Sequence, residues 1–239
     1  MIKTDLPIYS LVILIAFLSN IVVICNISFK KNRFNYDLLY LLIFEHIGMI
    51  IGAKIYSYLL DPAKYNYQFN ILKVGFSSVG AVIGIIIMSI IYIKLFKINI
   101  KTIIETFICS IPLIYSIGKI GCFLTGCCYG IYYNGPFSIT YHYSPNNNNG
   151  ISLFPIQLLE SIVFFIIFII TYKIVINNKI SNKTVGIITI LIFISKFLLD
   201  FLRYTHMNSL ITFNQIICIP FILIGFLLIV LKKEYINIK

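Results

Sequence analysis

Ionisable side chains fall inside several long apolar stretches of this sequence. An ionised group at the centre of a bilayer costs roughly 2.5–3.5 kcal/mol on insertion scales, so each such residue needs a partner or a function. Within one stretch, Lys196, Asp200 and Arg203 are spaced i, i+4 and i+7, which places them along one face of a helix. The full set of candidates is Glu45, His46, Lys54, Lys119, Glu160, Lys196, Asp200 and Arg203.

Six of these residues, all except Glu45 and His46, are expected at a similar depth in the membrane. They come from four apolar stretches. They are four bases and two acids, so the group has a net charge of +2. We therefore expect a shared polar cavity that attracts an anion, and the most available anion at that depth is a phospholipid headgroup. In the alternative, structural interpretation, two ion pairs hold helices together and the remaining bases reach the interface. Those pairs are Lys196 with Asp200 and Lys119 with Glu160.

A run of glycines and cysteines surrounds one of these bases, Lys119. Glycines allow helix backbones to approach closely and let a helix unwind into a loop. A lysine beside the exposed backbone amides of such a loop is suited to holding a phosphate. The run reads Gly118-Lys119-Ile120-Gly121-Cys122-Phe123-Leu124-Thr125-Gly126-Cys127-Cys128-Tyr129-Gly130.

Three cysteines of this run, Cys122, Cys127 and Cys128, leave several interpretations open. Outside the membrane two thiols can form a disulfide, and adjacent cysteines can be S-acylated or bind a soft metal ion. A thiol near two bases can also be a nucleophile, so Cys127 and Cys128 are candidates to carry a covalent lipid intermediate. Alternatively, the cysteines pack as small apolar residues. Three thiols without a nearby histidine or fourth thiol are a poor zinc site, so we expect no metal and no cofactor.

The elements that must position these residues follow from the composition. Of the 239 residues, 59% are hydrophobic and only 11% are charged, which is typical of a membrane protein. The lysines lie between the apolar runs rather than on one face, which argues against a nucleic-acid partner despite a net charge of +11. Because a helix needs about 20 apolar residues to cross a bilayer, the sequence predicts one all-α transmembrane domain over residues 1–239 with seven spans. These spans are 7–28, 38–60, 71–93, 103–125, 154–176, 184–203 and 211–231.

Basic residues alternate from loop to loop and so predict the orientation. By the positive-inside rule the basic loops are cytoplasmic, which puts the N-terminus outside and the C-terminus in the cytoplasm. The basic residues are Lys30, Lys31, Arg33, Lys94, Lys97, Lys101, Lys173, Lys179, Lys183, Lys232, Lys233 and Lys239. The stretch 126–153 contains no Lys, Arg, Asp or Glu and is expected outside. Its tyrosines are suited to the headgroup level: Tyr129, Tyr132, Tyr133, Tyr141 and Tyr143.

The glycine and cysteine run resembles the signature of the prolipoprotein diacylglyceryl transferase family, Gly-Arg-x-Gly-Asn-Phe-x-Asn-x-Glu-x-x-Gly. Gly118, Gly121, Phe123 and Gly130 match it, and Lys119 takes the place of the arginine. Further similarities follow in order from the second predicted span to the end of the chain. They are Gly52-Ala53-Lys54, Gly80-Ala81-Val82-Ile83-Gly84, Phe154-Pro155-Ile156-Gln157-Leu158-Leu159-Glu160, Lys196-Phe197 with Asp200 and Arg203, and Phe213-Asn214-Gln215 through Pro220.

This resemblance implies a multi-pass enzyme of the bacterial plasma membrane whose active side is extracytoplasmic. Such enzymes move a diacylglyceryl group from phosphatidylglycerol to the lipobox cysteine thiol of secreted prolipoprotein precursors and release glycerol phosphate. The resemblance implies catalytic roles for Lys119, Lys196, Asp200 and Arg203. It implies substrate-binding roles for Gly118, Gly121, Cys122, Gly130, Gln157, Glu160, Lys54 and Gln215.

Several polar positions of the family pattern are replaced in this sequence. Val79 and Phe154 stand where the family has histidines, Cys122 and Thr125 replace asparagines, and Cys127 replaces a glutamate. Two alternatives therefore stay open. One is an enzyme of the same fold that uses its cysteines and a different acceptor. The other is a non-enzymatic membrane protein, such as a lipid carrier or a small-solute transporter.

Overall fold

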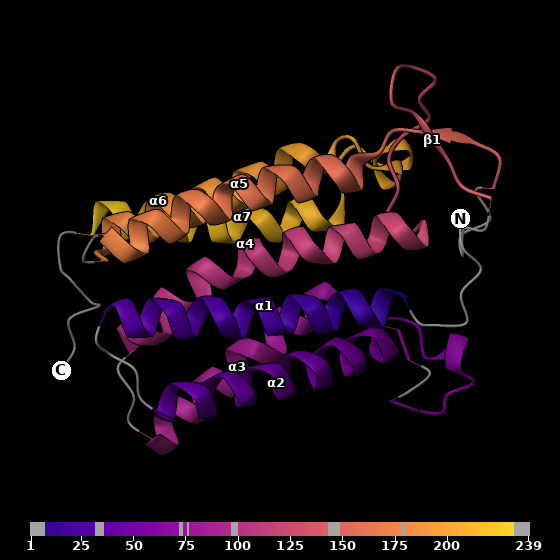
Figure 1. Cartoon of the computed structure of the whole chain (residues 1–239). Coiled ribbons are helices and arrows are strands. Elements are labelled where there is room, and N and C mark those ends of the chain that lie inside the picture. The colour runs from indigo at the N-terminus through magenta and orange to yellow at the C-terminus, as the bar shows by residue number, and fades with distance from the viewer. Residues whose placement is uncertain are drawn as a thin grey trace. The chain divides into compact units, whose positions relative to one another are not determined.

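The computed structural model describes residues 8–31, 36–71, 74–75, 77–96, 100–142, 149–177 and 180–231 (Figure 1). These residues form an almost entirely helical protein, as predicted, with one short β-ribbon that was not predicted. The α-helices are α1 (Ile8–Lys30), α2 (Tyr36–Leu60), α3 (Ser78–Phe96), α4 (Ile100–Thr125), α5 (Ile156–Asn177), α6 (Asn182–Asp200) and α7 (Phe213–Val230). The other elements are the 3-10 helices η1 (Ala63–Tyr65) and η2 (Tyr204–Asn208) and the strands β1 (Ile139–Thr140) and β2 (Ser152–Leu153).

Six helices in the described part of the chain are long and apolar enough to cross a membrane: α1, α2, α4, α5, α6 and α7. The apolar part of α3, Gly80–Phe96, is shorter. Many of the large apolar side chains on these helices are exposed, as expected where lipid rather than water surrounds a bundle. A multi-pass membrane protein is therefore confirmed, while seven crossings and the orientation of the termini stay predictions.

Part of the charge pattern behind that orientation lies outside the described residues. This applies to Arg33, Lys97, Lys179, Lys232, Lys233 and Lys239.

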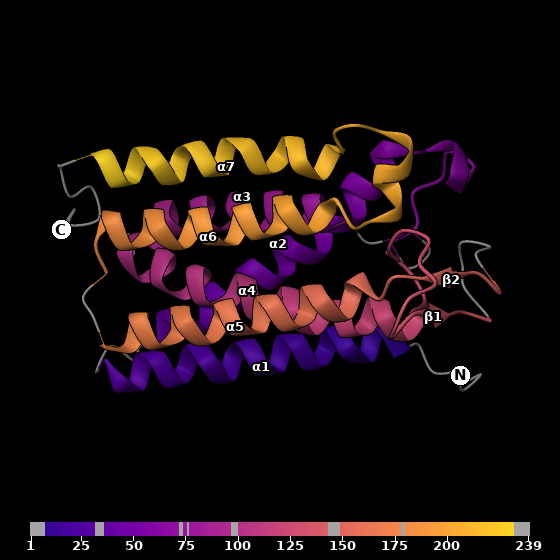
Figure 2. The same cartoon turned by 90° about the horizontal axis from the view of Figure 1, so that it is seen from above.

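The chain forms two compact units. Unit 1 comprises residues 1–30 and 104–237, and unit 2 comprises residues 31–103 and 238–239. In unit 1, α6 packs along α7 on one side and α5 on the other, and α1 runs beside α5 (Figure 2). Phe164 of α5 and Ile188 of α6 belong to the buried core of this unit. The single domain over residues 1–239 stays a prediction.

In unit 2, the α2–α3 hairpin packs backbone against backbone. A Cβ atom built on Gly84 would lie 1.9 Å from the carbonyl oxygen of Gly48, and one built on Gly52 would lie 2.4 Å from that of Gly80. Only glycine fits at such a contact, so these four residues set the separation of the two helices. The two family-like segments around Gly52 and Gly80 therefore have a packing role.

Two helix boundaries differ from the predicted span limits where the adjoining backbone makes other contacts. The third span begins at Ser78 rather than at 71, because the preceding backbone is bound to α2: Ser77 N–H donates to the carbonyl of Ala53 at 3.3 Å. The sixth span ends at Asp200 rather than at 203, because the following backbone pairs with another segment: Ile131 N–H donates to the carbonyl of Leu202 at 3.1 Å. Apolar composition alone does not reveal either of these contacts.

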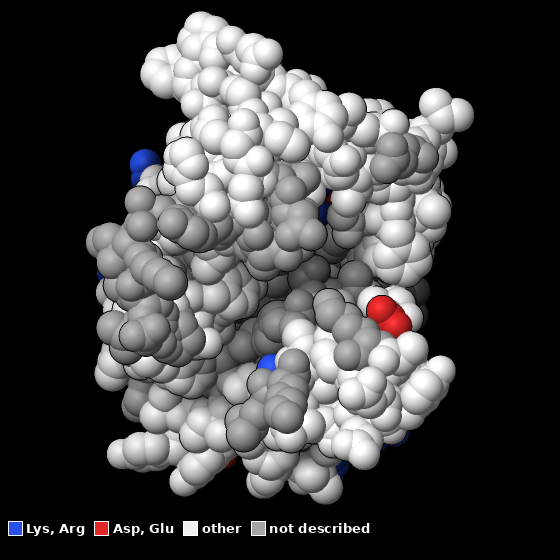
Figure 3. Space-filling model, turned by 90° about the vertical axis from the view of Figure 1, so that its right-hand side faces the viewer, with Lys and Arg blue, Asp and Glu red and all other residues white. Residues whose placement is uncertain are grey.

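The described part of the charge-free stretch 126–153, residues 126–142 and 149–153, is a folded part of unit 1 rather than a simple connector. Ile139 of β1 lies opposite Leu153 of β2 in an antiparallel ribbon. Tyr141 is 4% exposed and so packs inside the protein, whereas Tyr132 is exposed. The placement of these tyrosines at the headgroup level stays a prediction. Tyr143 lies outside the described residues. Figure 3 shows few blue or red atoms among the described residues at the end of the molecule that carries this ribbon.

We predict that Gly84→Ala lowers the free energy of unfolding by about 1–3 kcal/mol, because the added methyl group collides with backbone that cannot move aside. Thermal unfolding in detergent measures the effect. Gly118→Ala is the matched control, since no described atom lies within 4 Å of a Cβ built there. Equal melting temperatures for the two variants would contradict the backbone contact.

Candidate active site

A single carboxylate, that of Glu160 near the start of α5, lies at the centre of the ionisable residues of unit 1. Its side chain is fully buried. Lys119 Nζ of α4 lies 2.8 Å from Oε2, and Lys196 Nζ of α6 lies 3.0 Å from Oε1. Arg203, which follows α6, donates from Nη2 to Oε1 at 3.0 Å and to Oε2 at 2.9 Å. We use the name charge cluster for five residues: these four and Asp200, which is described below.

Tyr115 of α4 belongs to the same network, although the sequence analysis did not select it. Its hydroxyl donates to Glu160 Oε1 at 2.8 Å and accepts from Lys196 Nζ at 2.5 Å. Its ring lies under both lysines, with Nζ of Lys119 at 5.0 Å and Nζ of Lys196 at 4.9 Å from the ring centroid. The signal for Tyr115 was its spacing, because it precedes Lys119 by four residues and shares its helix face.

Asp200 holds the other end of the cluster together. Its side chain is fully buried, and it accepts hydrogen bonds from the hydroxyl of Thr212 and, at 3.1 Å, from Nδ2 of Asn214. Arg203 Nε lies 3.6 Å from Asp200 Oδ1. Lys196 pairs with Glu160 instead of Asp200, so one of the two predicted structural ion pairs was wrong. The other, Lys119 with Glu160, is confirmed.

Arg203 reaches Glu160 from an extended segment and not from the face of α6. Its backbone forms a bridge with Gly130, beyond the end of α4. A Cβ atom on Gly130 would lie 2.5 Å from the carbonyl oxygen of Phe154, so this position requires glycine. Gly130 therefore fixes the approach of the arginine, and a direct contact with substrate stays a prediction.

Two glutamines predicted to bind substrate hold the backbone around the cluster. Gln157 Nε2 donates to the carbonyl of Cys127 at 2.8 Å, while its Oε1 is buried without a hydrogen-bond partner among the described residues. Gln215 accepts from Thr212 N–H at 3.0 Å in a capping box that starts α7. The unpaired oxygen of Gln157 is thus an available acceptor beside Glu160.

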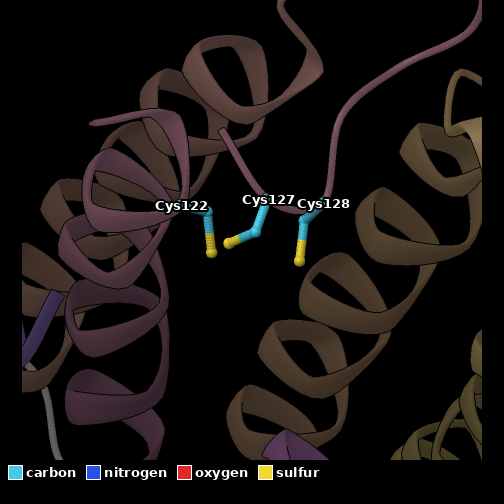
Figure 4. Close-up of side chains that lie close together, drawn as sticks. All are labelled: Cys122, Cys127 and Cys128. Carbon is cyan, nitrogen blue, oxygen red and sulfur yellow. The ribbon is translucent and has the colours of Figure 1, made fainter. Parts of the chain in front are cut away.

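The remaining predicted residues are distributed as follows. A Cβ atom on Gly121 would meet Val12 of α1 at 3.1 Å, so Gly121 serves helix packing, whereas Gly118 borders open space. Lys54 lies in unit 2, where its Nζ donates to the carbonyl of Val74 at 2.6 Å, and its part in the site stays a prediction. The side chain of Val79 lies outside the described residues. Cys122, Cys127 and Cys128 lie together at the end of α4 (Figure 4).

The charges of the cluster do not cancel. Three cations face the carboxylates of Glu160 and Asp200, so one positive charge is in excess. Because these side chains are buried, the uncompensated positive charge has a free-energy cost, and binding of an anion would reduce that cost. The arrangement is therefore suited to bind a monoanion and to stabilise negative charge that develops on a leaving group.

The comparisons with known proteins agree with the resemblance noted in the sequence. A profile of the family described as prolipoprotein diacylglyceryl transferase matches residues 1–231. A phosphatidylglycerol–prolipoprotein diacylglyceryl transferase of Clostridium tetani is 29% identical over 204 residues, which cover 82% of this chain and 81% of the relative. The second such enzyme of Clostridium perfringens is 31% identical over 192 residues, covering 77% of this chain and 73% of the relative. That of Wolbachia pipientis is 28% identical over 200 residues, covering 76% and 73%.

We predict that Glu160→Gln destabilises the protein by about 3–5 kcal/mol, because it leaves three buried cations around a neutral amide. The loss appears as a lower melting temperature in detergent. Lys183→Gln also replaces a charged side chain by a neutral amide, at an exposed position, and is expected to alter stability by less than about 0.5 kcal/mol. A Glu160→Gln protein as stable as the native chain would show that the carboxylate does not hold the cations.

Proposed function

The chain belongs to the prolipoprotein diacylglyceryl transferase family, and from this premise we propose that it transfers a diacylglyceryl group from phosphatidylglycerol to the lipobox cysteine thiol of prolipoproteins. In this reaction the acceptor sulfur forms a bond to the terminal glyceryl carbon of the lipid. The bond between that carbon and the phosphate oxygen breaks, and glycerol phosphate leaves with the bonding electrons. The thiol proton is released, and the product is a thioether.

The observation that carries this proposal is the convergence of Lys119, Lys196 and Arg203 on one buried carboxylate. A phosphodiester carries one negative charge, which matches the one positive charge in excess in the charge cluster. An ammonium group has three N–H donors. The ion pair of Lys119 with Glu160 uses one of them and leaves donors for phosphate oxygens.

Phosphate binding and departure of the leaving group both require these residues to stabilise negative charge on phosphate oxygens. Negative charge grows on the phosphate oxygen as its bond to carbon breaks, and fixed cations in a buried site stabilise that charge without having to reorganise. Glu160 has a positioning role, because it holds the three side chains of Lys119, Lys196 and Arg203 in one place. Asp200 has the same role for Arg203, through its contact with Nε.

The neighbours of the charge cluster offer room and an acceptor for the glycerol headgroup. The open space beside Gly118 adjoins Lys119 in the sequence. The buried Oε1 of Gln157, one helical turn before Glu160, can accept a hydrogen bond from a headgroup hydroxyl. A matching hydroxyl would satisfy an oxygen that the protein itself leaves without a partner among the described residues.

The site is proposed to face the extracytoplasmic side of a bacterial plasma membrane. The residues of the charge cluster lie at the ends of α4 and α6 and the start of α5, beside the charge-free stretch 126–153. The positive-inside rule assigns such a stretch to the outside and the lysine-bearing loops to the cytoplasm. With seven crossings, the N-terminus is outside and the C-terminus is cytoplasmic.

Expression of the chain in cells depleted of their own transferase tests the activity. We expect a lipobox reporter to gain thioether-linked diacylglyceryl, measured by mass spectrometry of the reporter's N-terminal peptide. If the native chain folds and inserts but leaves the reporter unmodified, the proposed function is wrong.

The role of the cations is tested by Lys196→Gln in the purified enzyme. Loss of one charge-stabilising donor lowers rates by about 10²–10³-fold in comparable sites, and we expect a fall of that order in kcat/KM for phosphatidylglycerol. Lys183→Gln, at an exposed position near the start of the same helix, is the matched control and should retain the native value. Equal activity of both variants would remove Lys196 from the catalytic machinery.

A further inference from the structure

Three cysteine sulfurs lie together beyond the charge cluster. The Sγ atoms of Cys122, Cys127 and Cys128 all lie within 4.8 Å of one another. Figure 4 shows the sulfur of Cys127 directed toward that of Cys122. In this view the sulfur of Cys128 lies on the other side of Cys127. Among the described residues, no histidine or carboxylate belongs to this group. We call the three residues the thiol cluster.

The end of α4 brings the first two thiols together through a specific backbone motif. Cys127 N–H donates to the carbonyl of Cys122 at 3.1 Å, and Gly126 N–H donates to that of Phe123 at 3.3 Å. Gly126 has φ +72°, so these bonds form a Schellman motif with glycine at the left-handed position. The motif folds the chain back over its last turn and places Cys127 above Cys122.

Cys128 then adopts a backbone conformation that its side chain disfavours. Its φ is +54°, in the left-handed region that costs a residue other than glycine about 1–2 kcal/mol. Such strain persists only where the surroundings impose it, and it is common at functional sites. Here the strained residue is the one that brings the third sulfur within 4.8 Å of the other two.

The turn is anchored from α5 as well. Nε2 of the fully buried Gln157 donates to the carbonyl of Cys127 at 2.8 Å. The hydroxyl of Thr125 lies 3.4 Å from Cys127 Sγ. Neighbours of this kind orient the ligands of metal sites and limit their motion.

Two simpler roles do not account for this arrangement. Cysteines that pack as small apolar residues are buried, whereas Cys128 is exposed and Cys127 is half-buried. A thiol that took up the diacylglyceryl group would become a thioether. Its carbon–sulfur bond has no activated leaving group, so the group could not pass on to an acceptor.

We propose that Cys122, Cys127 and Cys128 form a three-thiolate site for Cu(I). Three sulfurs placed about 2.3 Å from one central ion, in a plane with it, are about 4.0 Å apart. The observed separations, all within 4.8 Å, need only a small contraction to reach that value. On binding, three Cu–S bonds form, each thiol that is still protonated releases a proton to water, and copper stays in its +1 state.

The number and softness of the ligands favour Cu(I) over zinc. Thiolates select soft ions such as Cu(I), and a three-sulfur set satisfies the trigonal geometry that Cu(I) accepts. Structural zinc sites are almost always tetrahedral with four protein ligands, and the described residues supply three. Cys128 is exposed, which places this side of the site at the protein surface.

Copper binding is measured on the purified full chain in detergent, under anaerobic and reducing conditions, against a chromogenic Cu(I) chelator. We expect one Cu(I) per chain and three sulfur neighbours in the X-ray absorption spectrum. Cys128→Ser removes one exposed ligand with little risk to folding. It should weaken Cu(I) binding by more than the roughly 10–100-fold that changes around the ligands cost.

Cys25→Ser is the matched control, because it removes a thiol outside the cluster and should leave the affinity unchanged. The proposal is wrong if the native chain loses all copper to the chelator or if both variants bind copper equally. It is also wrong if the site retains Zn(II) in preference to Cu(I), or if anaerobic thiol titration finds the cluster closed as a disulfide. None of these readings depends on transferase activity.

Discussion

One carboxylate, Glu160, holds three cations inside an apolar helical bundle. Lys119, Lys196 and Arg203 come from different segments of unit 1, and each would be costly to bury alone. A single negative charge cannot neutralise three positive ones, and Asp200 compensates only one more. The excess charge is therefore a property of the bundle itself. In the proposed function it would supply both the affinity for an anionic headgroup and the stabilisation of a departing phosphate.

The N-terminal part of α5 connects the charge cluster to the thiol cluster. Gln157 and Glu160 are three residues apart, so they share a helix face. One binds the carbonyl of Cys127, and the other binds the cations. The stretch after α4 is fixed again where Gly130 pairs with Arg203. A shift of this stretch would thus move Arg203 and the cysteines together. The stretch itself has no charged residues, yet its backbone is bound to Gln157 and Arg203.

The sequence predicted the apolar helices and all five residues of the charge cluster, because both follow from the free-energy cost of placing a side chain in an unsuitable solvent. Burial of a charge in lipid is expensive, and this alone selected Lys119, Glu160, Lys196, Asp200 and Arg203. It could not predict which acid pairs with which base, because Arg203 lies beyond the helix in an extended segment whose position depends on a distant backbone contact. Tyr115 and Thr212 were missed because a hydroxyl in an apolar helix or at a helix start carries no charge to attract notice. The convergence of the cysteines depends on a positive φ at Cys128, and this backbone conformation cannot be predicted from the residue type.

The central claim is that the excess positive charge around Glu160 binds the lipid phosphate. A high-resolution structure of the chain with phosphatidylglycerol in a lipid nanodisc tests it directly. The account predicts the phosphate within hydrogen-bonding distance, about 2.7–3.2 Å, of the nitrogens of Lys119, Lys196 and Arg203. A well-ordered lipid whose phosphate contacts none of these three residues would contradict it.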